Sequence, residues 1–403
     1  MSNEIVKDFS WPVNTFNEDE YLSFIKILNE HKDRMDGRPL FVFGAGIRGC
    51  MFIRFLQDGG INITGVTDND ENKWDGTIFN KYRIESLSWT LNQFTKPFFI
   101  ISVENSEKIV LQLRSKGLAG DDDFFIVPPV LYDNFIGEFY GKPNADTLIM
   151  GDCLFSTVGM DDTDKKSLGG LIFDKVDNRD KVKLLSVHGM PNHTFYHMLD
   201  LQVKLGVPIK RVLLSVNLAM LSGKKNQLPR AQHTPLLKKI HEKMPFQDEG
   251  YDEYIRLTEE RMNRFNTDSF VQSPKNARGH NSETIVNMRM RQNYMYRVKA
   301  DNEGVVYLDK IHWLCQKKNI RLIVMFPPIN YMHGREIFGD EFVEYCEHNT
   351  NELIKRLILN GEDVIDLTLS LKSDMFAATD TINEITNYAG RLKETEYIME
   401  HLR

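Results

Sequence analysis

The sequence predicts an α/β protein made of two domains, each built around a parallel sheet. Short apolar runs alternate with stretches of helical apolar spacing, which is the pattern of strands followed by helices. Several of these runs end directly at glycine or at a small polar residue, as strands do where a parallel sheet meets its ligand. The length of 403 residues also exceeds what one compact core normally holds. We therefore expect an N-terminal helical extension over residues 1–35, a first α/β domain over 36–140 and a larger one over 146–403.

The first domain opens with a short apolar strand that runs into a glycine-rich turn. Gly44, Gly46 and Gly49 have the spacing GxGxxG and precede a stretch of helical apolar spacing. The first two glycines let the backbone turn tightly and approach a pyrophosphate, and the third lets the helix pack against the strand. A second strand, residues 61–66, leads to Asp68, which is placed to bind a ribose. The pattern predicts a nucleotide or nucleotide-sugar site. The alternative is that the glycines serve packing and that Asp68 caps a turn.

Further strand–helix units follow over residues 98–103, 106–116 and 124–127. With the glycine-rich turn, they resemble the Rossmann-like domain often joined to bacterial polysaccharide- and sugar-modifying enzymes. The resemblance covers about residues 36–130 and implies a carbohydrate or nucleotide-sugar substrate. No recognisable catalytic domain of a dehydrogenase follows, so hydride chemistry is the less favoured use of this domain.

In the second domain, three apolar runs end at residues suited to acyl chemistry. The first leads to Gly151-Asp152-Cys153, the second to Gly189 and the third to Asn217. A sharp turn after a strand can place a small nucleophile at a helix N-terminus, where the helix dipole stabilises its anion. Two later apolar runs complete five strands that alternate with helices, so we expect a three-layer domain with a parallel sheet. The five runs are 147–150, 182–187, 211–216, 321–326 and 363–367.

The order of these blocks resembles the SGNH (GDSL-type) hydrolase and acyltransferase superfamily over about residues 146–400. In that family, Gly-Asp-Ser supplies the nucleophile, a glycine and an asparagine complete the oxyanion hole, and Asp-x-x-His supplies the base and its acid. Cys153 stands at the serine position, and Gly189 and Asn217 match the oxyanion donors. Asp380 matches the acid, and Asn383 stands where the family has histidine. The resemblance implies an enzyme that transfers or cleaves an acyl group on a sugar or a surface-polysaccharide (capsule) precursor.

The two departures from the family pattern leave the activity open. A thiol with a pKa of about 8.5 is already partly ionised, so Cys153 needs a base less than serine does. His188 or His193 could supply the missing imidazole, or Asp380 could act through water. Asn383 equally suits a catalytically degenerate protein that binds or scaffolds in polysaccharide biosynthesis. A nucleotide-sugar oxidoreductase is the third hypothesis.

Composition and the remaining segments limit the classes of ligand and partner that the chain is expected to bind. A net charge of −7 provides no basic field for nucleic acid. The four cysteines lack metal-ligand spacing, so no metal is expected. The N-terminus lacks a signal peptide pattern and no apolar run is long enough to span a bilayer, which indicates a cytoplasmic protein. Residues 222–285 form a polar, helical insertion. This insertion is either a lid over the site or a surface for homo-oligomerisation.

Overall fold

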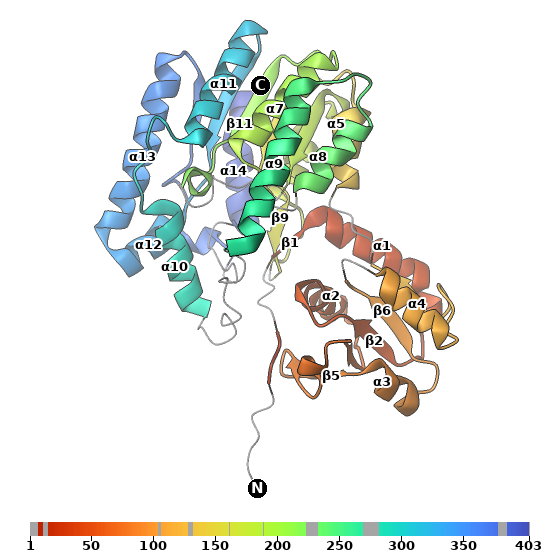
Figure 1. Cartoon of the computed structure of the whole chain (residues 1–403). Helices are drawn as coiled ribbons and strands as arrows, with labels where there is room; N and C mark the ends of the chain where they lie inside the picture. The colour runs from red at the N-terminus through yellow and green to blue at the C-terminus, as the bar shows by residue number, and fades with distance from the viewer. Residues whose placement is uncertain are drawn as a thin grey trace. The chain divides into compact units, whose positions relative to one another are not determined.

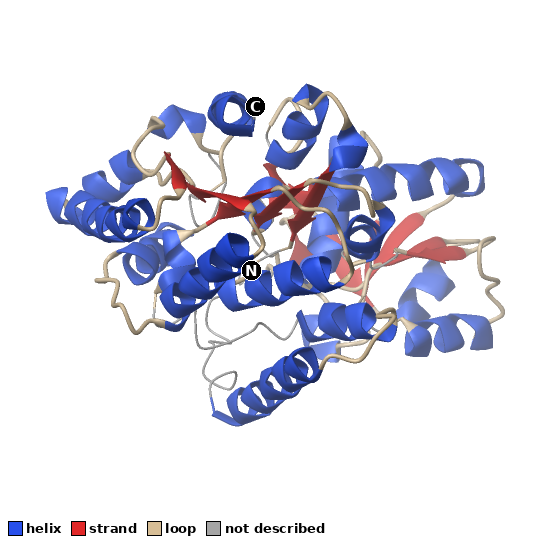
Figure 2. Cartoon of the chain, turned by 90° about the horizontal axis from the view of Figure 1, so that it is seen from above, coloured by secondary structure: helices blue, strands red, loops and turns tan. Residues whose placement is uncertain are grey.

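The computed structural model describes residues 7–10, 15–103, 106–127, 132–160, 162–187, 189–222, 233–268, 282–377 and 385–402, the side chains of 261–268 and 282–286 excepted. The chain divides into two compact units, Met1–Val130 and Leu131–Arg403. Both units are α/β with sheets of mostly parallel strands, which confirms the predicted fold class. Figure 2 shows the strands in red among the helices in blue.

Within the described residues, the first unit contains a six-stranded sheet. Its strands are β2 (Leu40–Phe43), β3 (Gly65–Thr67), β4 (Thr77–Ile78), β5 (Tyr82–Glu85), β6 (Phe98–Ile101) and β7 (Phe124–Ile126). They lie in the order β4-β5-β3-β2-β6-β7, and every pair is parallel except β4 with β5. Along the chain, the parallel strands therefore have the order 3-2-1-4-5 of dinucleotide-binding folds. Successive strands are added on one side of β2 up to β5 and then on the other side from β6. The switch point between β2 and β6 is where such folds bind ligands.

The helices of the first unit cover both faces of this sheet. They are α1 (Glu18–Met35), α2 (Ile47–Asp58), α3 (Leu87–Gln93) and α4 (Glu107–Ser115), and a short strand, β1 (Thr15–Asn17), precedes α1. Phe24 of α1 packs its ring 4.5 Å from the rings of Phe52 and Phe55 on α2. Ile109 and Leu113 of α4 are buried with α3 against the opposite face. The predicted N-terminal extension is thus a helix packed within the first unit.

Within the described residues, the second unit is built on a five-stranded parallel sheet. Its strands are β8 (Thr147–Gly151), β10 (Val182–Ser186), β11 (Arg211–Ser215), β12 (Arg321–Phe326) and β13 (Asp363–Asp366), and a short strand, β9 (Thr157–Gly159), lies outside it. The order is β10-β8-β11-β12-β13, or 2-1-3-4-5 along the chain. The chain leaves β8 for β10 on one side and then crosses to β11 on the other. The switch point, where open sheets of this kind bind ligands, therefore lies at the carboxyl end of β8.

Helices cover both faces of the second sheet and make three layers (Figure 1). They are α5 (Asp133–Gly141), α6 (Leu168–Lys175), α7 (Asn192–Lys204), α8 (His233–Glu242), α9 (Glu249–Asp268), α10 (Ser282–Tyr294), α11 (Glu303–Lys317), α12 (Tyr331–Phe338), α13 (Asp340–Leu359) and α14 (Tyr388–Leu402). One face of β8 packs Met150 into a core shared with α7, α11 and α13. The other face packs Ile149 against α6 and α14. In the part of the chain that the structure describes, no helix is long and apolar enough to cross a membrane.

The start of the inserted segment is part of the main core of the second unit. Leu237 of α8 and Tyr251 of α9 are almost fully buried, and the Tyr251 hydroxyl donates to the Leu237 carbonyl over 3.1 Å. Tyr140 of α5 also donates to α8, at the Ile240 carbonyl (2.6 Å). Figure 1 shows α9 beside α7, and the two helices are joined by Thr194 and Tyr254, whose hydroxyls lie 2.6 Å apart. This half of the insertion is therefore anchored in the domain core.

Candidate functional site

The predicted nucleophile and oxyanion residues follow three adjacent strands. Cys153 comes two residues after the end of β8, Gly189 three after β10 and Asn217 two after β11. Gly151 is level with Ser186 in the β8–β10 register, and β11 runs level with β8 on the other side. The three turns consequently leave the same edge of the sheet, at the switch point of the chain.

A buried hydrogen bond joins two of these turns directly. The Asn217 Nδ2 donates to Asp152 Oδ2 over 2.9 Å, and the Asn217 Oδ1 accepts from the Ala219 N–H over 2.9 Å. Asp152 and Asn217 are 3% and 7% exposed. The two partners fix which end of the carboxamide carries the nitrogen, because the oxygen must face the N–H donor. Among the described residues, no acceptor is seen for the second Nδ2 hydrogen.

Cys153 is half-buried and begins a single turn of 3₁₀-helix, Cys153–Phe155. Asp152 caps this turn through its Oδ1, which accepts the Leu154 N–H over 3.1 Å. Gly151 is required here, because a Cβ at that position would lie 2.3 Å from the Phe155 ring. The sequence predicts a helix that begins at Cys153. In the described residues, the single turn is instead followed directly by β9. One turn aligns few peptide dipoles, so it stabilises an anion at its N-terminus less than a full helix would.

Gly189 adopts φ +63°, a left-handed conformation that favours glycine. It turns the chain from β10 into α7, where His193 lies on the first turn. The His193 imidazole is buried, with its ring 5.7 Å from that of Tyr254 and 5.8 Å from that of Tyr307. It therefore packs among aromatic side chains of α9 and α11. His188, the other candidate base, lies outside the described residues.

Ser186 is a site residue that sequence reasoning missed. Its hydroxyl donates to the Asp152 carbonyl over 2.6 Å and lies 3.3 Å from the Ser156 hydroxyl. It thereby ties the end of β10 to the Cys153 turn. A sequence signal exists, because Leu-Leu-Ser-Val occurs at 184–187 and again at 213–216, on the two strands that flank β8.

Asp380 and Asn383 lie outside the described residues, but both ends of their segment are described. The Ala377 N–H donates to the Ile385 carbonyl over 2.9 Å, so the described residues on either side of 378–384 lie next to each other. Ala377 lies beside β9, because a Cβ on Gly159 would come within 2.9 Å of the Ala377 Cβ.

In the first unit, the structure explains two of the three glycines of the glycine-rich turn. Gly44 has φ +118°, and a Cβ on Gly49 would lie 1.8 Å from the Gly44 carbonyl oxygen, so the fold requires both. Gly46 has φ −105°, which any residue adopts, and a Cβ there would have no neighbour within 4 Å. Neither backbone conformation nor packing explains Gly46. The open space in front of it lies at the N-terminus of α2, where phosphates bind in such folds.

Asp68 is brought to the glycine-rich turn, where its carboxylate has partners within the unit. Its Oδ2 accepts the Ala45 N–H (2.6 Å) and the Lys73 ammonium (3.1 Å), and its Oδ1 accepts the Asp70 N–H (2.8 Å). The strand before it is shorter than expected, because β3 begins at Gly65, although the Thr64 N–H already donates to the Leu40 carbonyl of β2 over 2.7 Å. A ribose hydroxyl at Asp68 would have to share these oxygens with the Ala45 N–H and Lys73.

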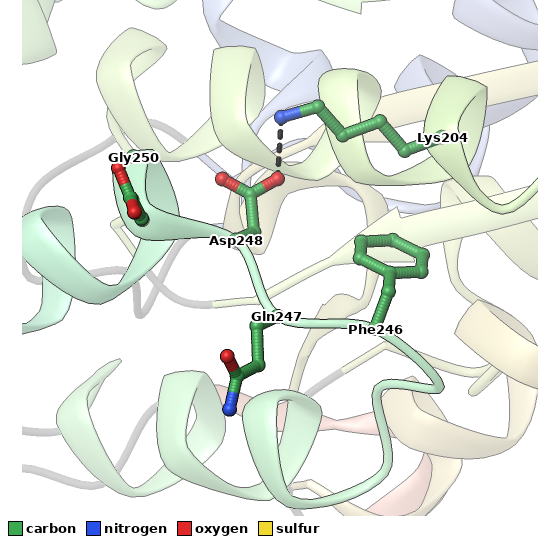
Figure 3. A pocket seen from close by; sticks show the side chains of 6 residues that line it. Lys204, Phe246, Gln247, Asp248 and Gly250 are labelled. Carbon is green, nitrogen blue, oxygen red and sulfur yellow. Dashed lines mark hydrogen bonds and ion pairs between the residues drawn. The ribbon is translucent and has the colours of Figure 1, made fainter.

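A shallow surface depression lies near the C-terminal end of α7 (Figure 3). Its one lysine, Lys204, pairs with Asp248 and lies 2.6 Å from Asp200, so its charge is neutralised. Because α7 runs back from the Gly189 turn to the start of β11, this depression lies at the edge of the sheet opposite Cys153. We therefore assign it no part in the site. Across the described residues, no group of three or more His, Cys, Asp or Glu side chains could hold a metal.

No protein-family model matches the chain, and no curated protein matches it. Among solved structures, one that matches is the crystal structure of a GDSL-like lipase from Bacteroides thetaiotaomicron. The sequence identity is 10% and the TM-score 0.30, and the match covers 67% of this chain and 96% of that chain.

Proposed function

We propose that the chain transfers or cleaves an acyl group on a sugar or a surface-polysaccharide precursor, with Cys153 as the nucleophile. The observation that supports this most is the buried Asp152–Asn217 hydrogen bond at the switch point of the second sheet. It holds a carboxamide nitrogen beside the Cys153 turn. Acyl transfer places negative charge on the former carbonyl oxygen, and prepositioned N–H donors stabilise that charge.

The proposed reaction has two steps. The Cys153 thiolate attacks the acyl carbonyl, while the Asn217 Nδ2 and the Gly189 N–H stabilise the oxyanion. Collapse of the tetrahedral intermediate breaks the bond to the leaving group, which takes a proton from water or from the Asp380 carboxyl group, and leaves a thioester on Cys153. A sugar hydroxyl, or water in the hydrolytic variant, then attacks the thioester and restores the thiolate. Asp380, in the block that ends at Asn383, accepts the proton of the attacking hydroxyl directly or through water.

The sugar acceptor follows from the resemblance of the first unit to domains joined to polysaccharide-modifying enzymes. A degenerate binding protein would keep the same fold without a reactive thiol. Alkylation of the native chain with iodoacetamide across pH 5.5–9 separates the two, because the thiolate is the species that reacts.

We expect Cys153 to be alkylated rapidly below pH 8 and the other cysteines to remain unmodified. Burial raises the pKa of the Cys315 and Cys346 thiols to about 12, and Cys50 is 0% exposed. Peptide mass spectrometry after short exposure gives the modified fraction of each thiol. A Cys153 that stays unmodified up to pH 9 would rule out the proposed nucleophile.

We propose in addition that the first unit holds a nucleotide or nucleotide-sugar at its glycine-rich turn. The observation that favours this site is Gly46, whose missing side chain serves neither backbone nor packing. A phosphate approaching the N-terminus of α2 would use that open space. The nucleotide would be the part of an activated sugar that the first unit binds.

A Gly46→Val variant is expected to weaken nucleotide binding at least about tenfold while its melting temperature stays within 2 °C of wild type. Isothermal titration calorimetry with ADP, UDP-glucose and NADH measures the affinities. Gly49→Ala is the contrasting control and should lower the melting temperature strongly, because its Cβ would overlap the Gly44 carbonyl. Equal affinity of Gly46→Val and wild type would contradict the site, and tight binding of NADH alone would favour the oxidoreductase.

A further inference from the structure

One side-chain hydrogen bond from β10 reaches the peptide directly in front of the proposed nucleophile. The Ser186 hydroxyl, at the end of that strand, donates to the Asp152 carbonyl over 2.6 Å. A carbonyl oxygen and the N–H that follows it belong to one planar trans peptide and point in opposite directions. The bond therefore fixes the Asp152 carbonyl and, with it, the direction of the Cys153 N–H and the start of the Cys153 residue.

Asp152 is held from both neighbouring strands of the sheet. From the side of β11, its Oδ2 accepts the Asn217 carboxamide over 2.9 Å, and from the side of β10 its carbonyl accepts the Ser186 hydroxyl. Its Oδ1 accepts the Leu154 N–H (3.1 Å), and its carbonyl also accepts the Phe155 N–H (3.3 Å). Asp152 is 3% exposed, so a contact that is lost here is not readily replaced by water.

The Ser156 hydroxyl extends this connection to the far end of the Cys153 turn. It lies 3.3 Å from the Ser186 hydroxyl, and the Ser156 N–H donates to the Cys153 carbonyl over 3.1 Å. The single hydroxyl hydrogen of Ser186 is used on the Asp152 carbonyl, which cannot donate, so Ser156 is the donor between the two hydroxyls. Ser186 thus contacts the chain on both sides of Cys153.

A serine in the equivalent place on the other side of β8 makes no such contact. Ser215 ends β11 as Ser186 ends β10, and the two strands run level with β8, so the two serines flank Gly151. Their side chains share one face of the sheet, because Leu184 and Leu213, two residues earlier, both pack in the core with α6 and α14. The Ser215 hydroxyl is buried and has no hydrogen-bond partner in the described chain.

The fold itself does not require the Ser186 hydroxyl, because the ladder between β8 and β10 already joins these strands over five residue pairs. We propose that Ser186 is a positioning residue, which sets the orientation of the Asp152–Cys153 peptide and so directs the Cys153 thiol toward a substrate carbonyl beside Asn217. The inference rests on the proposed acyl-transfer function and extends it to a side chain that acts through the backbone of the nucleophile.

The kinetic test uses the full chain and a short activated ester, p-nitrophenyl acetate, as probe. Ser186→Ala removes the donor, and we expect it to lower the Cys153-dependent kcat at least about tenfold with KM within about twofold of wild type, because small misplacements of catalytic groups cost that much. Ser215→Ala is the matched control, since it deletes the same atom at the same level of the sheet. It should keep kcat within about twofold, and its melting temperature should not fall, because the deleted hydroxyl is unpaired.

A second pair of variants separates the hydrogen bond from the shape of the side chain. Ser186→Thr keeps the hydroxyl, and Ser186→Val has the shape of the threonine variant without the donor. We expect Ser186→Thr to retain kcat within about threefold of wild type and Ser186→Val to be as impaired as Ser186→Ala. Equal activity of the threonine and valine variants would contradict the positioning role. This comparison still decides if Ser186→Ala does not fold.

Alkylation shows whether a loss of turnover comes from orientation or from unfolding. Iodoacetamide needs a thiolate but no alignment with the oxyanion donors, so Cys153 in Ser186→Ala should react within about threefold of the wild-type rate. A purely structural role for Ser186 would instead make the buried thiols of Cys315 and Cys346 accessible to the reagent. Their modification in folded-state conditions would overturn the inference.

The outcomes also separate this inference from the proposed function. An unchanged kcat in Ser186→Ala, with turnover that still requires Cys153, overturns the positioning role and leaves the proposed function standing. Turnover that persists in Cys153→Ala overturns both. A wild-type chain that neither hydrolyses the ester nor gains an acetyl group on Cys153 overturns both as well.

Discussion

Replacing Cys153 with alanine is expected to reduce acyl transfer or ester cleavage by at least about 10³-fold, because only the oxyanion donors and substrate binding remain. Cys153 is half-buried, so the substitution leaves a small change in packing and a melting temperature close to that of wild type. Turnover of p-nitrophenyl acetate and loss of the acyl-enzyme mass in quenched samples measure the effect. Cys315→Ala is the matched control, since that thiol is buried in the main core and its variant should keep wild-type turnover.

A Cys153→Ser variant tests the chemistry further. A serine hydroxyl needs a base, and Asn383 stands where the resembled family has histidine, so this variant should be nearly as inactive as Cys153→Ala. Adding Asn383→His should then recover at least about tenfold of the lost turnover, as expected of a general base. Full activity in Cys153→Ala would end the proposal. Full activity in Cys153→Ser would show that another base serves the nucleophile.

The second large effect is expected at Asn217. Asn217→Ser should lower kcat by about 10²–10³-fold, the range observed when one oxyanion donor is removed. Serine can still cap the 3₁₀-turn by accepting the Ala219 N–H, so the fold of the turn is kept. KM should change little, because the lost hydrogen bond forms with the oxyanion and contributes little to ground-state binding.

Asn302→Ser is the matched control for Asn217→Ser. Asn302 donates to the Leu221 carbonyl over 2.8 Å at the other end of the same turn, and it caps α11 through the Gly304 N–H. Serine retains that cap but loses the bond to Leu221. We expect a lower melting temperature with kcat within threefold of wild type. If both variants lose activity equally, Asn217 acts by shaping the turn and its role as a donor is wrong.

Much of the architecture could be predicted because it depends on local patterns. Alternating apolar runs and helical spacing predict the five strands of the second sheet and four strands of the first, β2, β3, β6 and β7, but they miss β4 and β5. Glycine or asparagine marks the ends of the runs that lead to Gly44, Gly151, Gly189 and Asn217. The parallel order follows from the right-handed crossovers that such units make. The turns of Cys153, Gly189 and Asn217 could be placed on one edge of the sheet by the same argument.

The contacts within the site could not be predicted, because they join residues far apart in the chain. Nothing local to Asp152 indicates that its carboxylate meets Asn217, 65 residues later. From the sequence, Ser186 is only the last residue of a strand. The structure shows that its hydroxyl donates to the Asp152 carbonyl. His193 looks like a candidate base beside Gly189, yet tertiary packing places its ring near those of Tyr254 and Tyr307.

The packing of α14 has a consequence for how the second unit folds. This helix, which follows every strand of the sheet in the chain, packs together with α6 on the face of β8 that carries Ile149. During synthesis, the strand that carries the Cys153 turn can therefore have α6 against this apolar face early, but the face stays partly uncovered until more than 230 further residues have been added. Such long sequence separation slows folding and leaves the nascent chain open to aggregation or chaperone binding in the meantime.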